Sequence, residues 1–144
     1  MMRSKRYKLL FCLVNVFIPL MIGLVYYLVF RPYTYLSLLF KQLFDVTAKV
    51  SIKPNPLIDN YICDLLWSYS TTYLIAEIAQ KHHIGKIDLI IILGVLISLP
   101  ELLQYFQIIT GTADFIDVIV QFIGCVLALV IQKYMGGSYY AEQN

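Results

Sequence analysis

Long apolar runs constrain this chain more than any other feature of its sequence. The first run, from Leu9 to Phe30, extends over 22 residues without a charged side chain, and three more apolar runs with a few charged residues follow. Of the 144 residues 60% are hydrophobic and 14% are charged, whereas a soluble domain is about 45–50% apolar and about 25% charged. The composition therefore indicates that lipid is the solvent of much of the chain.

The apolar runs predict an all-α membrane protein with four transmembrane helices. A helix satisfies its own backbone groups in lipid, and about 20 residues cross a hydrocarbon core of about 30 Å. We expect the spans at about 9–30, 57–80, 87–109 and 113–135, within a single membrane domain that covers 1–144. The first run is too long for the apolar part of a signal peptide, so we expect it to be retained.

The segment 33–50, between the first and second spans, has a different pattern. Leu36, Leu39 and Leu43 recur at steps of three and four residues, while Lys41 and Lys49 fall on the opposite side. This period is typical of an amphipathic helix. The segment is too polar to span, so we expect it to lie in the membrane interface.

The distribution of Lys and Arg predicts the orientation. One side of the membrane would carry seven of these residues and the other side four. The first group is Arg3, Lys5, Arg6, Lys8, Lys81, Lys86 and Lys133, and the second group is Arg31, Lys41, Lys49 and Lys53. Because basic residues are retained in the cytoplasm, both termini are expected to be cytoplasmic.

Acidic and amide side chains interrupt the apolar runs. A charge at the centre of a span costs about 2.5–3.5 kcal/mol on insertion scales, so such residues usually face protein, water or an ion. The predicted orientation brings the acids of three helices to the outer half of the membrane. We therefore predict an outward-facing acidic pocket for a polar or cationic headgroup or an envelope amphiphile, with the ligand-binding residues Asp64, Glu101, Gln104, Asp114, Asp117 and Gln121.

Small residues predict how the helices that carry these acids pack. Gly94 and Ser98 in the third span, and Gly124 and Ala128 in the fourth, are each four residues apart. Small residues at this spacing let membrane helices approach closely. We expect the third and fourth helices to touch at these residues and to open above them.

Other roles for the carboxylates stay open. Asp64, Glu101 and Asp117 are oxygen ligands that suit a divalent cation such as Mg²⁺ or Ca²⁺, in a metal- or acid-assisted enzyme acting on a lipid-linked substrate. No catalytic residue is assigned, because Ser68 has no His or Lys partner, and an enzyme is not the favoured interpretation. The third alternative is a structural or immunity partner of another membrane protein. The net charge of +2 does not favour nucleic acid as a partner.

The polar positions also resemble a known signature. Glu101-x-x-Gln104, a short turn, Asp114-x-x-Asp117 and then Gln121-x-x-Gly124 resemble the motif of the VanZ-like family of bacterial membrane proteins. Gln121 stands where that family usually has Asn, and the histidine often found on its earlier helix is absent. The resemblance implies a multi-pass protein of the bacterial plasma membrane that acts on envelope molecules and is linked to glycopeptide resistance.

Overall fold

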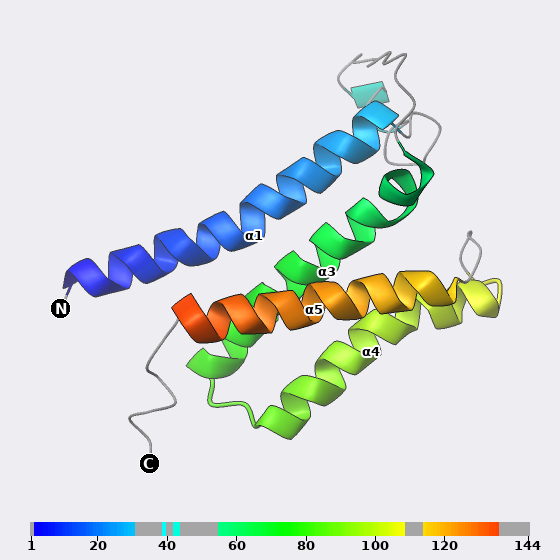
Figure 1. Ribbon diagram of the computed structural model, residues 1–144. Coiled ribbons are helices and arrows are strands. Elements are labelled where there is room, and N and C mark those ends of the chain that lie inside the picture. Colours follow the sequence, from blue (N-terminus) through cyan, green and yellow to red (C-terminus); the bar gives the residue numbers. More distant parts are fainter. Residues whose placement is uncertain (1, 31–38, 40–41, 44–54, 109–113, 136–144) are drawn as a thin grey trace.

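The structure is a computed structural model that describes residues 2–30, 39, 42–43, 55–108 and 114–135 (Figure 1). Within these residues the fold is all-helical, as the sequence predicts. Its four long helices are α1 (Met2–Phe30), α3 (Pro56–Lys81), α4 (Lys86–Tyr105) and α5 (Phe115–Met135).

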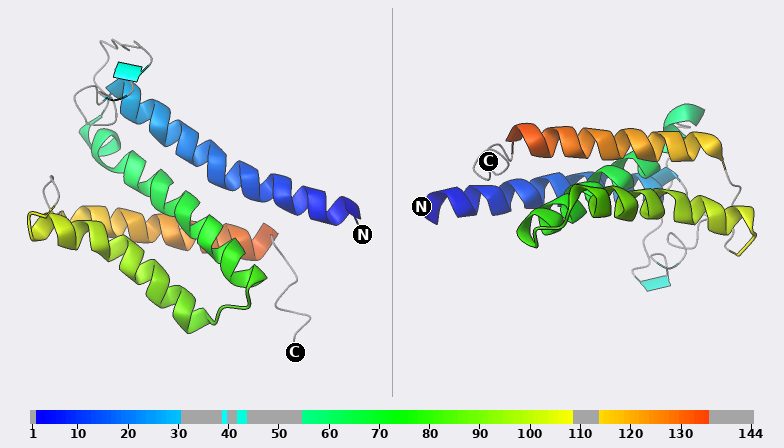
Figure 2. Two further views of the ribbon diagram at one scale, coloured as in Figure 1. Left: turned by 180° about the vertical axis from the view of Figure 1, so that it is seen from behind. Right: turned by 90° about the horizontal axis from the view of Figure 1, so that it is seen from below.

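Helix α3 is the centre of the fold. It packs along α1 on one side and along α5 on the other, whereas α4 has far fewer contacts with α3 and α5. Figure 2 shows that the start of α1, the turn between α3 and α4, and the end of α5 lie at the same end of the molecule. The end of α4 and the start of α5 lie at the opposite end, the end at which α3 begins (Figure 1).

Three of the four helices are long and apolar enough to cross a membrane. These candidate spans are Leu9–Phe30, Lys86–Tyr105 and Phe115–Tyr134, and they indicate a multi-pass membrane protein. Helix α3 is not among them, although the sequence predicts a span there. Its acidic residues Asp59, Asp64 and Glu77 and its run of Ser, Thr and Tyr lower its hydropathy. Ser68, Ser70 and Thr72 of that run are buried.

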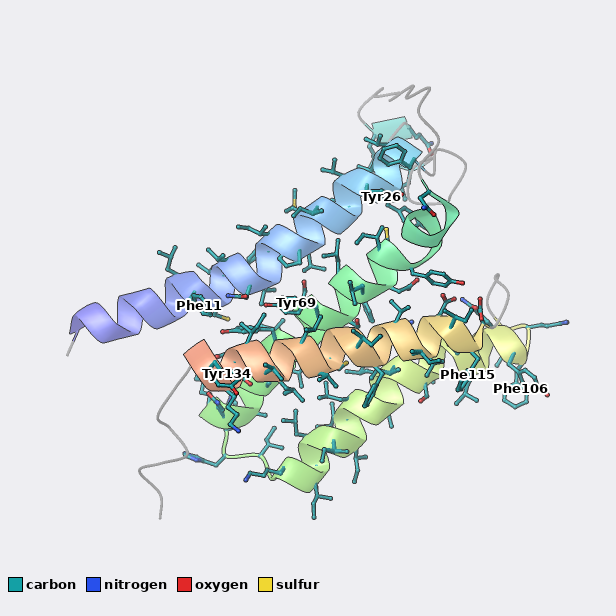
Figure 3. The ribbon with its side chains drawn as sticks, in the orientation of Figure 1. Phe11, Tyr26, Tyr69, Phe106, Phe115 and Tyr134 are labelled. Carbon is teal, nitrogen blue, oxygen red and sulfur yellow. The ribbon has the colours of Figure 1, made fainter. Side chains whose placement is uncertain are left out.

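A polar contact joins α1 to α3 near the middle of both helices. The Tyr69 hydroxyl donates a hydrogen bond to Asn15 Oδ1 at 2.6 Å, and Asn15 Nδ2 donates to the Phe11 carbonyl oxygen at 2.9 Å. Tyr69 lies between the two helices in Figure 3. A buried polar group needs such a partner, so Asn15 contributes to helix packing.

The predicted limits of the spans agree closely with the structure, with two differences. Helix α1 begins seven residues earlier than the predicted span, at Met2, so its basic start is helical. Helix α4 ends at Tyr105, four residues before the predicted limit. The predicted interfacial helix at 33–50 lies outside the described residues, apart from Leu39, Gln42 and Leu43, and stays a prediction.

The expected contact between the small residues of α4 and α5 is wrong. Beyond the adjacent residues and backbone of α4 itself, no atom of the described residues lies within 4 Å of a Cβ built on Gly94, and Ser98 is exposed. Gly124 and Ala128 are buried, and Gly124 lies against α3 instead. Helix α3 has the small residue Ser68 at this point, so the backbone of α3 lies closer to Gly124 than the backbone of α4 does.

Gln107 explains why α4 ends early. It has a left-handed backbone with φ of 57°, its N–H donates to the Gln104 carbonyl oxygen at 2.9 Å, and the Ile108 N–H donates to the Leu103 carbonyl oxygen at 2.8 Å. This pair of bonds is a Schellman motif, in which glycine is the usual left-handed residue. His83, with φ of 54°, ends α3 in the same way.

Replacing Gln107 by glycine should therefore stabilise the fold. The left-handed conformation costs about 1 kcal/mol for a residue with a Cβ and little for glycine, so we expect Gln107→Gly to raise stability by up to about 1 kcal/mol. Thermal unfolding of the purified protein in detergent measures this change. Leu103→Gly, inside the last turn of the same helix, is the control and should destabilise it. A lower melting temperature for Gln107→Gly would contradict the assignment of the motif.

Candidate functional site

Asp114 stands directly before α5 and forms its N-cap. Its Oδ1 accepts a hydrogen bond from the Ile116 N–H at 2.9 Å, and its carbonyl oxygen accepts one from the Asp117 N–H at 3.1 Å. The first N–H groups of a helix have no partner inside the helix, and Asp is among the residues that best supply one. The carboxylate also lies at the positive end of the helix dipole. Asp114 therefore has a structural role in starting α5.

Glu101 connects α4 to this cap. Its Oε2 accepts a hydrogen bond from the Asp114 backbone N–H at 3.1 Å. In a capping box this N–H is bound by the third residue of the same helix, which here is Asp117. Glu101 fulfils that function from a neighbouring helix. The Glu-turn-Asp spacing of the sequence thus corresponds to a cap shared between two helices.

Tyr61 brings α3 to the same point. Its hydroxyl donates a long hydrogen bond to Asp114 Oδ2 at 3.5 Å and is within electrostatic range of the Asp117 carboxylate. The sequence did not single out Tyr61, because a tyrosine near the end of an apolar helix is common at a membrane interface. We refer to Tyr61, Glu101, Asp114 and Asp117 as the acidic cluster.

An open groove between α4 and α5 lies beside the acidic cluster. It has a volume of about 280 Å³. Glu101 and Asp114 contribute carboxylates and Ser98 a hydroxyl, and the rest of the wall is formed by the largely apolar side chains of Leu102, Tyr105, Phe115 and Val118. Phe115 lies near the junction of α4 and α5 in Figure 3. An apolar groove with a few polar groups at one place is the usual form of a site for an amphiphilic ligand.

The two helices that form this groove carry only acidic charges near it. The chain contains no Lys, Arg or His between Lys86 and Lys133, so α4 and α5 supply no cation that could pair with their own acids near the groove. The dipole of α5 contributes only about half a positive charge at its N-terminus. The two carboxylates that line the groove and the nearby Asp117 exceed this compensation within α4 and α5, which favours a cationic ligand.

The other predicted site residues are placed differently. Asp64 is partly buried on α3, one turn after Tyr61, and Gln104 is partly buried on α4, but neither lines the groove. Gln121 is buried on the side of α5 that faces α3. Of the six predicted residues, Glu101 and Asp114 line the groove, and Asp117 lies beside them in the first turn of α5. Asp64, Gln104 and Gln121 lie elsewhere.

A second polar contact lies near the opposite ends of α3 and α5. Gln132 is buried, and its Nε2 donates a hydrogen bond to Glu77 Oε1 at 3.3 Å. Midway between this contact and the acidic cluster, the Thr72 hydroxyl donates to Cys125 Sγ at 2.8 Å.

Glu77 therefore has a structural role, because its carboxylate accepts a hydrogen bond that links α3 to α5. A repeat of polar residues at matching positions on the two helices is the signal that could have identified this pair.

The divalent-cation alternative finds no set of ligands in the described part of the chain. No three His, Cys, Asp or Glu side chains there are close enough together to hold a metal ion. Asp64, Glu101 and Asp117 belong to this part.

Comparison with protein-family models, with curated protein sequences and with solved structures gave no match. The site is therefore interpreted from its own geometry and charge.

Proposed function

We propose that this protein binds the cationic headgroup of an amphiphile in the groove between α4 and α5. The observation that carries the proposal is the position of Glu101 and Asp114 at the edge of a largely apolar groove. A headgroup would interact with the carboxylates while an apolar tail lies along Leu102 and Phe115. Desolvation of the groove by the tail strengthens the attraction between the charges.

We also propose the membrane topology that gives this groove access to envelope molecules. In this topology α3 is a fourth span, shielded by α1 and α5, and both termini are cytoplasmic in a bacterial plasma membrane. The length of α3, 26 residues, and the shared end of α1, α3 and α5 where the basic residues lie support this arrangement. The resemblance to VanZ-like proteins makes a lipid-linked or amphiphilic envelope molecule, and a role in glycopeptide resistance, part of the same proposal.

Binding of dodecylammonium to the protein in neutral lipid nanodiscs tests the proposed site. We expect the double variant Glu101→Gln, Asp114→Asn to bind this amine about tenfold more weakly at low salt, a loss of about 1.4 kcal/mol. Both substitutions remove charge and keep an acceptor for the Asp114 and Ile116 N–H groups, because Asn is a good N-cap. Isothermal titration calorimetry measures the affinity.

Two controls separate charge from shape. The neutral amphiphile dodecyl maltoside should bind wild type and double variant equally, because the apolar walls of the groove are unchanged. Glu77→Gln removes a carboxylate near the other end of α3 and should not change the affinity for dodecylammonium. Equal affinity of wild type and double variant for dodecylammonium would contradict the proposal. Glu101 and Asp114 would then serve only to cap α5.

A further inference from the structure

The side-chain amide of Gln121 is buried in the interface between α3 and α5. The residue is 3% exposed, and its Oε1 has no hydrogen-bond partner among the residues that the structure describes. A buried carbonyl oxygen left without a donor is strongly disfavoured, so native proteins nearly always pair it with protein or with ordered water. The oxygen of Gln121 therefore requires a donor from outside the described side chains.

Gln121 is directed toward the acidic cluster. It follows Asp114 and Asp117 at steps of three and four residues, so the three side chains share one face of α5. Side chains in a helix lean toward its N-terminus, which inclines the amide toward the turn that carries Asp117. By this geometry we expect the unpaired oxygen of Gln121 to lie near the turn of α5 that carries Asp117.

Gly124, the next residue on this face of α5, lies in close contact with α3. A Cβ built on Gly124 would lie 2.7 Å from the Leu65 carbonyl oxygen and 3.1 Å from the Tyr69 nitrogen, so the two helix backbones are in direct contact there. Ser68, which also lies against Gly124, is 3% exposed. The space around the Gln121 amide is consequently bounded, on the side toward the C-terminal end of α5, by the backbone contact at Gly124.

We infer that a water molecule is bound at Gln121, between the acidic cluster and Gly124. Water supplies the donor that Oε1 lacks and is small enough for a position that bulk solvent barely reaches. A buried water needs two to four polar partners. In this part of the interface they are Gln121 Oε1, the Asp117 carboxylate one turn away and Ser68 Oγ. This water site is separate from the groove and does not depend on the proposed function.

Hydroxyl-radical footprinting with X-rays tests the site, because radicals formed from a bound water label the side chains beside it. Cys125 is the reporter, since it is 5% exposed and follows Gln121 by one turn on the same side of α5. In the full chain in nanodiscs we expect Cys125 to be oxidised at least as fast as Cys12, which is only partly buried. In Gln121→Met the rate at Cys125 should fall on the order of tenfold, because the water loses a partner.

Gln132→Met is the matched control, because Gln132 is the other buried glutamine of α5 and its Nε2 already bonds to Glu77. It should leave the rate at Cys125 unchanged. The inference is overturned if Cys125 of wild type is oxidised far more slowly than Cys12, or if Gln121→Met leaves its rate unchanged. The first of these results needs only the wild-type chain and decides the question even if Gln121→Met does not fold.

Discussion

Replacing Gly124 by alanine is expected to destabilise the fold by about 2 kcal/mol, because the added methyl group overpacks the contact between α3 and α5. Two of the three atoms that a Cβ would meet belong to the backbone, the Leu65 carbonyl oxygen at 2.7 Å and the Tyr69 nitrogen at 3.1 Å. The third is Ser68 Oγ. Backbone atoms cannot rotate away, so the helices would have to separate. Thermal unfolding in detergent, followed by circular dichroism, measures the loss.

Gly94→Ala is the matched control for this prediction. In the part of the chain that the structure describes, a Cβ at Gly94 meets nothing within 4 Å outside the nearby backbone of α4, and alanine is the better helix former by up to about 1 kcal/mol. We expect unchanged or slightly higher stability. Ser68→Ala combined with Gly124→Ala should recover part of the loss, since it removes the one contact that belongs to a side chain. Equal effects of the two glycine substitutions would contradict the assigned packing.

The glycines show what the sequence could predict about packing. Their spacing with Ser98 and Ala128 correctly marked Gly124 as a place of close approach, because small residues are needed wherever two membrane helices touch. It could not tell which helix would be the partner. That choice depends on Ser68, which gives α3 a surface as small as that of α5. Gly94 has the same spacing and no such partner.

The helices themselves were predictable because the apolar runs are long and separated by polar turns. The end of α4 was not, since the left-handed residue that terminates it is Gln107 and no glycine marks the position. The early end affects the site directly. Because α4 ends soon after Glu101, this side chain lies near the start of α5 and accepts a hydrogen bond from the Asp114 N–H at 3.1 Å.

The acids of the candidate site were recognised from their unusual place in apolar segments, but their contacts were not. The sequence suggested one pocket lined by six residues. In the structure Glu101 and Asp114 line a groove, whereas Gln121 is buried against α3. A helix face is broad enough that residues three and four positions apart contact different neighbours. Spacing alone does not distinguish a residue that faces a groove from one that faces a helix.

Asp114→Ala is the second substitution for which we expect a large effect, a loss of about 1–2 kcal/mol of stability. It leaves the Ile116 N–H without its cap and removes the acceptor of the Tyr61 hydroxyl. Alanine keeps the Asp114 N–H that binds Glu101, but the first turn of α5 that positions this N–H loses its side-chain cap. The start of α5 should therefore loosen before the contact between α3 and α5 opens. Hydrogen exchange followed by mass spectrometry should therefore show faster exchange at 115–118 and unchanged exchange around Gly124.

Asp114→Asn separates the cap from the charge at this position. Asparagine caps helices as well as aspartate does, so the stability and the exchange at 115–118 should stay close to wild type. The affinity for dodecylammonium should nevertheless fall, because the carboxylate is gone from the edge of the groove. A variant as unstable as Asp114→Ala would mean that the charge itself holds α5 in place. Normal stability with unchanged affinity would mean that Asp114 is a cap and nothing more, and the cationic ligand would then have to be sought elsewhere.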